Sequence, residues 1–99
     1  EVSVTAELNG RQIEGTIDRL MIAPDRVLAI DFKSNRVVPD RSDQVPDGIL
    51  RQMGAYAHAL GQIYPDRRID TAILWTAGPM LMYLDPEAVT AALQRATLT

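Results

Sequence analysis

The chain has 99 residues, is 46% hydrophobic and carries a formal net charge of −3, which predicts one domain, residues 1–99, with a core of its own. The absence of cysteine excludes disulfide bonds, thiolate metal ligands and a cysteine nucleophile, and no apolar run is long enough to cross a membrane. The acidic balance argues mildly against a stand-alone nucleic-acid binder, although nine of the ten basic residues are arginine, which suits bidentate phosphate contacts.

The first third of the chain predicts an antiparallel meander. Apolar and polar side chains alternate on both sides of Asn9-Gly10, a dipeptide typical of a hairpin turn, and Pro24 marks the following turn. Gly15, inside the second alternating run, indicates a bulge or a point of close backbone approach. The strands expected here are residues 2–8, 11–22 and 27–33.

After the predicted meander, a segment without periodicity precedes the first predicted helix. Residues 34–46 are polar and lack periodicity, and a loop of this length suggests function or mobility. The later elements expected are a helix at 47–64, strands at 69–76 and 80–84, and a helix that starts at Asp85-Pro86. The order βββ-α-ββ-α predicts an α+β fold with a mixed sheet, with one or both helices covering its faces.

Charged side chains occupy the end of the most hydrophobic predicted strand. Asp31 and Lys33 share one face of this strand, whereas Ile30 and Phe32 share the other. Aspartate is depleted in strands, and a carboxylate near a core must be paired or bound to a cation. For a lone Asp-x-Lys tripeptide, a strand end that emerges into solvent is the more frequent explanation.

A second acid, Asp18, makes a shared site the better explanation. If the second and third strands pair through the turn at Pro24, position 18 faces position 31. Two facing carboxylates repel, and a bound cation removes this repulsion. With Lys33 they match a divalent-metal site for phosphodiester hydrolysis, in which the lysine orients a water or stabilises charge on the phosphate. A salt bridge from Lys33 to either acid is the alternative, and it needs no catalysis.

Polar side chains on the predicted helix extend this candidate site. Gln52 and Tyr56, four residues apart, share a helix face offset from the apolar stripe, where they would contact a phosphate or another ligand. A tyrosine packed at a domain edge beside an exposed glutamine is an equally good interpretation. His58 points away from this face, so we expect a surface residue and not a ligand. Arg36 flanks the site as a candidate contact for DNA phosphates, although solvated loop arginines are commoner.

Three segments in order resemble the RecB-type nucleases of the PD-(D/E)XK superfamily. The pattern usual in that family is G-x-x-D-R, then D-[YF]-K-T, then Q-x-x-x-Y. This chain has Gly-Thr-Ile-Asp-Arg at 15–19, Asp-Phe-Lys-Ser at 31–34 and Gln-Met-Gly-Ala-Tyr at 52–56, with serine in place of the usual threonine. Nearly the whole chain is similar to the C-terminal nuclease domains of AddA-type helicase–nucleases, which process bacterial double-strand breaks.

The resemblance implies a restriction-endonuclease-like fold and cleavage of DNA in double-strand break repair and recombination. It implies Mg²⁺, with Mn²⁺ as an alternative, held by Asp18, Asp31 and the backbone carbonyl of Phe32. Lys33 would assist the attacking water, and Gln52 and Tyr56 would lie near the DNA strand. ATP would be used only by a helicase part outside these residues, and a second, AddB-like subunit would be the protein partner.

One departure from the family pattern concerns the segment before the first strand. Family members carry a histidine ligand on a helix there, whereas this chain begins at Glu1 in the strand, so we expect a piece of a longer protein that lacks the first core helix. We expect weak activity from this piece alone, self-association through the groove left exposed and, without a basic apolar leader, a cytoplasmic location. A catalytically inactive nuclease-like module for DNA binding or scaffolding is the alternative, which the presence of Asp18, Asp31 and Lys33 together disfavours.

Overall fold

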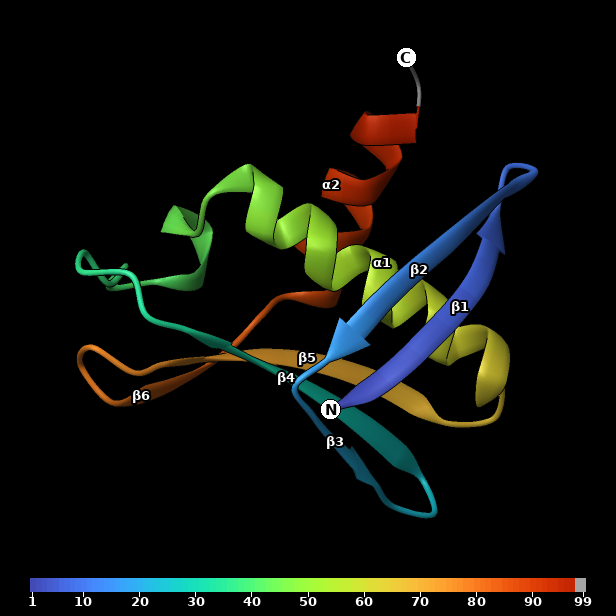
Figure 1. The fold of residues 1–99 in the computed structure, drawn as a ribbon, viewed down its shortest axis with the longest axis horizontal. Coiled ribbons are helices and arrows are strands. Elements are labelled where there is room, and N and C mark those ends of the chain that lie inside the picture. The colour runs from blue at the N-terminus through green and yellow to red at the C-terminus, as the bar shows by residue number, and fades with distance from the viewer. Residues whose placement is uncertain (98–99) are drawn as a thin grey trace.

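The computed structural model describes residues 1–97 and confirms the predicted α+β fold with a mixed sheet (Figure 1). Its strands are β1 (Val2–Leu8), β2 (Arg11–Ile17), β3 (Arg19–Ile22), β4 (Arg26–Lys33), β5 (Arg68–Trp75) and β6 (Met80–Tyr83). Its helices are α1 (Asp47–Ile63) and α2 (Pro86–Thr97), and a short 3₁₀ helix, Ser42–Gln44, lies within the predicted loop. No helix in the described part of the chain has the length and apolar character needed to span a bilayer.

The strands form two sheets. β1 and β2 pair as an antiparallel hairpin, and the other strands form a four-stranded sheet in the order β3-β4-β5-β6. β4 and β5 are parallel, whereas β3 and β6 pair antiparallel at the two edges. Because parallel neighbours need a crossover connection, α1 joins β4 to β5 and packs across one face of the sheet (Figure 1).

The turn of the β1–β2 hairpin follows its sequence signal. Asn9 and Gly10 have φ angles of 52° and 79°, the positive values that a two-residue type I′ turn requires. The pairing register runs from Leu8 opposite Arg11 to Val2 opposite Ile17. The hairpin therefore places the end of β2, and the residue that follows it, beside the larger sheet.

The single strand predicted over residues 11–22 is wrong, because β2 ends at Ile17 and β3 begins at Arg19. Asp18 stands between them, and its carboxylate accepts a hydrogen bond from the backbone N–H of Phe32 in β4. A side-chain bond of this kind competes with regular strand pairing. The break therefore places the acid at the junction of the two sheets.

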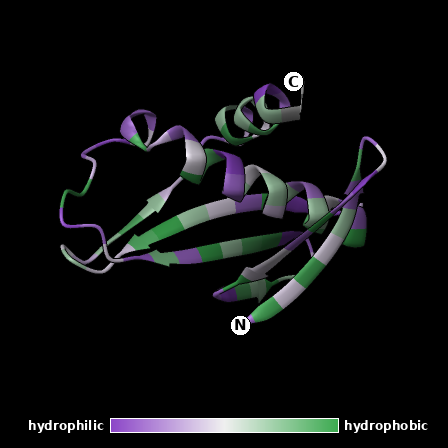
Figure 2. Cartoon of the chain, turned by 45° about the horizontal axis from the view of Figure 1, so that its top comes forward, coloured by the Kyte–Doolittle hydropathy of each residue, from purple (hydrophilic) through white to green (hydrophobic). Residues whose placement is uncertain are grey.

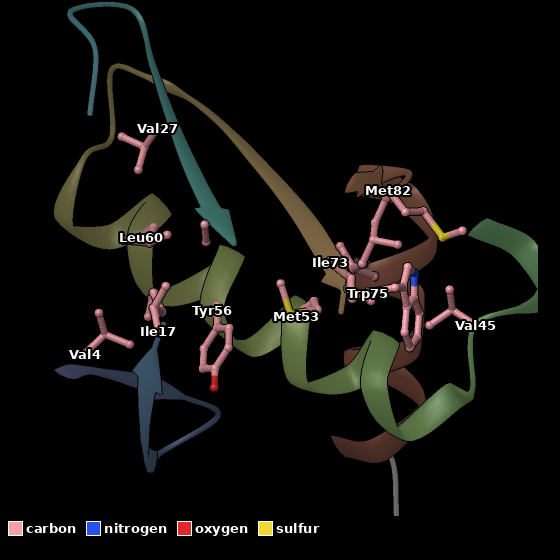
Figure 3. Packing of buried hydrophobic residues seen from close by; sticks show 14 residues of the cluster. Val4, Ile17, Val27, Val45, Met53, Tyr56, Leu60, Ile73, Trp75 and Met82 are labelled. Carbon is pink, nitrogen blue, oxygen red and sulfur yellow. The ribbon is translucent and has the colours of Figure 1, made fainter. Parts of the chain in front are cut away.

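The main core lies between α1 and the four-stranded sheet. Met53 and Leu60 of α1 are fully buried, in one cluster with Val27, Ile73 and Trp75 of the sheet (Figure 3). These α1 residues are seven apart and so lie on one helix face, as the sequence periodicity predicted. This packing fixes α1, and with it the polar residues on the adjoining face of the helix.

The second helix packs closely on the first at a glycine. A Cβ atom added to Gly54 of α1 would overlap the backbone carbonyl oxygen of Val89 in α2, and it would lie 3.1 Å from Cβ of Leu93. Val89 is 1% exposed and belongs to the main core cluster. The two helices therefore lie on the same side of the sheet, at a separation that only glycine allows at position 54 (Figure 2).

The opposite face of the sheet carries a smaller apolar cluster formed by Leu28, Ile30 and Ala72. Around it, Leu81 and Tyr83 of β6 are 45% and 51% exposed. Within residues 1–97 both helices lie on the other side, so no helix covers this apolar face (Figure 2). Exposed apolar patches often mark association sites. The self-association expected from the sequence stays a prediction, for which this face provides a surface.

Candidate active site

Two carboxylates come together where the hairpin meets β4. β3 pairs with β4 in the register that sets Arg19 opposite Ile30, so the next position brings Asp18 opposite Asp31. This confirms the register predicted from the turn at Pro24. Asp31 is only 4% exposed and points to the face of β4 that α1 covers, together with Val27.

Asp18 is held by the backbone of the strand that carries Asp31. Its Oδ2 accepts a hydrogen bond from the Phe32 N–H at 2.9 Å. This bond is the main cause that lowers the pKa of Asp18, and a hydrogen bond between the two carboxyl groups adds to it. The N–H and C=O of one strand residue point to the same lateral side, so the carbonyl of Phe32 also faces the side of Asp18. Oxygen atoms of Asp18, Asp31 and Phe32 are therefore available at the same junction.

Lys33 stands beside the acids. Its Nζ lies 2.9 Å from Oδ2 of Asp31 and donates a hydrogen bond to Oε1 of Gln52 at 3.1 Å. The contact with Asp31 is an ion pair, but its angle does not meet hydrogen-bond geometry, so Oδ2 is buried without an aligned donor. Burial raises the pKa of Asp31, although Lys33 opposes the shift and Asp18 adds to it. Oδ2 of Asp31 can therefore still accept a hydrogen bond or bind a cation.

Gln52 and Tyr56 lie on one face of α1, as the four-residue spacing predicted, and form a chain of hydrogen bonds to the site. Gln52 Nε2 donates to the Tyr56 hydroxyl at 3.0 Å, and that hydroxyl donates to the backbone carbonyl of Thr16 at 2.8 Å. Burial raises the pKa of Tyr56, and the negative charge of Asp31 raises it further. The predicted close approach at Gly15 is confirmed, because the Tyr56 ring lies directly against it.

Two other residues singled out in the sequence lie apart from this cluster. Arg36 is exposed beyond the end of β4, and its contact with DNA stays a prediction. His58 is half-buried, with its Nε2 2.9 Å from the backbone carbonyl of Glu7. His58 is thus partly exposed, in agreement with the expected surface position, and its ring contacts the hairpin on the side away from the acids.

A second buried acid, Asp70, also has an Oδ2 without an aligned hydrogen-bond donor, so the two acids differ in the charges around them. Asp70 in β5 is 5% exposed, and it forms ion pairs with Arg26 at 3.3 Å and Arg68 at 3.1 Å. Two cations therefore neutralise one carboxylate. At Asp31 the ratio is reversed, because two carboxylates share a single lysine.

The donor set fits a hard divalent cation. Mg²⁺ is usually bound by one or two carboxylates, with water and substrate oxygens completing the coordination. Asp18, Asp31 and the Phe32 carbonyl offer oxygen atoms only, and Asp31 Oδ2 has no aligned donor to displace. Within the described residues no cluster of three or more His, Cys, Asp or Glu side chains is present. The two carboxylates and the carbonyl would therefore fill only part of the coordination sphere of such an ion.

Asp31→Asn is expected to raise the melting temperature in chelator at neutral pH, or to leave it unchanged. Because the pKa of Asp31 is raised in the native state, its contribution favours folding at low pH and is lost as the pH rises through that pKa. Thermal unfolding between acid and neutral pH measures the difference, which should shrink toward acid pH. A marked drop in melting temperature at neutral pH would instead show that the ion pair with Lys33 stabilises the fold.

Comparison with known proteins agrees with this geometry. The family model described as the PD-(D/E)XK nuclease superfamily matches residues 1–97, and the chain belongs to this superfamily. Its members are nucleases and generally use divalent metal ions. No curated protein and no solved structure shows a significant match to the chain.

Proposed function

We propose that this chain hydrolyses phosphodiester bonds of DNA in a reaction that depends on Mg²⁺ or Mn²⁺. The observation that carries the proposal is the pairing of Asp18 with Asp31 beside the ammonium of Lys33. A structural ion pair needs one acid for one base, whereas this site has an excess of negative charge that a dication would balance. Superfamily membership supports the same reaction class.

Asp18, Asp31 and the carbonyl of Phe32 would hold the metal ion. When bound, the ion supplies a Lewis acid that polarises the phosphate and offsets the charge of the transition state. Asp31 must lose its proton to act as a ligand, and its raised pKa means that metal binding weakens as the solution becomes acid.

Lys33 would act on the attacking water and on the phosphate. Its ammonium donates hydrogen bonds, so it can fix a water oxygen in line with the scissile P–O bond, and it can stabilise the negative charge that builds on the phosphate oxygens. Gln52 and Tyr56 would lie close to the DNA strand, and Arg36 would contact a backbone phosphate, which suits its exposed position after β4.

The segment pattern supports a more specific assignment. We infer that the chain is the exonuclease domain of an AddA-type helicase–nuclease that acts in double-strand break repair and recombination in the cytoplasm. In that protein ATP is used by a helicase part outside residues 1–99, and an AddB-like subunit is the partner. The pattern from Gly15 through Tyr56 is the basis for this assignment.

The direct test is cleavage of end-labelled linear DNA by the intact protein with Mg²⁺, with Mn²⁺ and with chelator. We expect cleavage with either ion and none in chelator, and restoration when the ion is added back. Cleavage that continues in chelator would overturn the metal-dependent reaction. DNA binding without cleavage under all three conditions would instead support the inactive binding or scaffolding module.

A further inference from the structure

The hydroxyl of Tyr56 is bonded on both sides inside the protein. Tyr56 is 6% exposed, and its hydroxyl contacts the Thr16 carbonyl at 2.8 Å and Gln52 Nε2 at 3.0 Å. A carbonyl only accepts hydrogen bonds, so the single phenolic proton goes to Thr16. The group that faces the hydroxyl from Gln52 must then be its NH₂ donor. The direction of both bonds is therefore fixed by chemistry.

The orientation of the Gln52 side-chain amide determines which of its atoms faces Lys33. With its NH₂ group turned to Tyr56, Gln52 presents Oε1 to the lysine, and Lys33 Nζ donates to it at 3.1 Å. The same Nζ lies 2.9 Å from Asp31 Oδ2. An ammonium group has three N–H donors. One of them is donated to Gln52, and the ion pair holds the ammonium group against Asp31, so the remaining donors are left to meet a water or a phosphate oxygen.

We propose that Tyr56 is a positioning residue, which sets the direction of the remaining N–H donors of Lys33 by fixing the side-chain amide of Gln52. The catalytic consequence rests on the proposed nuclease function, whereas the positional part concerns only atoms of this chain. A direct DNA contact is the competing role for Tyr56. A contact with a DNA phosphate would need a donor, and the hydroxyl already gives its single proton to Thr16.

Gly15 belongs to the same arrangement. A Cβ added at Gly15 would lie 2.6 Å from Cε1 of Tyr56, closer than real Cβ contacts allow. The ring therefore rests on the bare backbone of β2, which lets the hydroxyl reach the carbonyl of the next residue, Thr16. Any side chain at position 15 must push the ring away and lengthen that hydrogen bond. Asp18 is three residues further along the same segment.

Tyr56→Phe in the intact protein tests the proposal, because it keeps the ring and removes only the hydroxyl. We expect kcat for DNA cleavage to fall about tenfold with KM unchanged, the effect of losing one or two hydrogen bonds of ordinary strength that align a catalytic group. Gly15→Ala should lower kcat in the same way although it retains the hydroxyl. Tyr83→Phe is the matched control, since Tyr83 is 51% exposed and lies on the opposite face of the sheet.

A double-mutant cycle separates positioning of Lys33 from contact with DNA. If Tyr56 acts through Lys33, then Tyr56→Phe causes no further loss of kcat in a Lys33→Met background. A tenfold loss that persists in that background, or a rise in KM as the main effect of Tyr56→Phe, would overturn the proposal in favour of DNA contact.

A measurement without DNA tests the positional part on its own. Side-chain NMR relaxation of Lys33 should show an ordered side chain in the wild type and in Tyr83→Phe, and a more mobile one in Tyr56→Phe. Equal order in all three proteins would overturn the proposal even if the protein cuts DNA. The expected contrast in a protein that fails to cut DNA would refute the nuclease function alone.

Discussion

In the proposed AddA-type helicase–nuclease, Asp31→Ala is expected to lower the rate of DNA cleavage by about 10³-fold, while ATP-driven unwinding continues. A bound divalent ion contributes several kcal/mol of transition-state stabilisation, and about 1.4 kcal/mol corresponds to a factor of ten in rate. Asp31 is the more buried of the two paired acids, and its Oδ2 has no aligned hydrogen-bond donor from the protein. Its removal would therefore take away a ligand of the proposed metal ion. Cleavage of labelled duplex DNA and strand displacement, measured on the same preparation, give the two rates.

Two further variants make this result specific. Asp18→Ala should cause a loss of similar size, because a single ion needs both carboxylates. Asp43→Ala removes an exposed acid whose partner is Arg41, at 3.3 Å, and should leave both rates unchanged. If unwinding disappears together with cleavage in Asp31→Ala, then Asp31 is required for folding and its role as a ligand is refuted.

Gly54→Ala is expected to produce the largest loss of stability among the glycine substitutions. The new methyl group would overlap the backbone carbonyl of Val89 and crowd Leu93, so α1 and α2 must separate. Overpacking of this kind costs about 1–3 kcal/mol. In a chain of about 100 residues, each kcal/mol lowers the melting temperature by roughly 4–8 °C. Thermal and urea unfolding measure the change.

Gly61→Ala is the matched control in the same helix. A Cβ at Gly61 would meet nothing within 4 Å. Alanine also favours the helical backbone by about 0.5–1 kcal/mol relative to glycine, so this variant should be more stable than the wild type. If both alanine variants shift stability in the same direction and by the same amount, the close packing of α1 on α2 at Gly54 is refuted.

The sequence was sufficient to predict the parts of the site that depend on local order. The turn at Pro24 joins adjacent antiparallel strands, so counting outward from it placed Asp18 opposite Asp31. Period-two alternation placed Lys33 on the same face as Asp31, and helical spacing placed Gln52 beside Tyr56. In each case the relation spans one turn or one element, for which geometry is nearly constant.

The parts that the sequence did not predict depend on contacts between distant segments. The break at Asp18 follows from the hydrogen bond that its carboxylate accepts from the backbone N–H of Phe32. Every residue except proline has such a donor, so the sequence pattern does not indicate which one Asp18 will bind. The bond from Tyr56 to the Thr16 carbonyl was missed for the same reason. The glycine at position 15 was the only signal of that contact, since it indicated a close approach without naming the partner. The half-buried position of His58 likewise depends on where the hairpin folds back over α1.

The lengths of the strands limit how copies of this chain could join. Both edge strands of the larger sheet, Arg19–Ile22 and Met80–Tyr83, have four residues, whereas the inner strands have eight. A short edge offers few free backbone donors and acceptors to an incoming strand, which hinders growth of the sheet into an amyloid-like ribbon. Copies that join through the larger sheet should therefore stack through its apolar face and not extend the sheet at its edges.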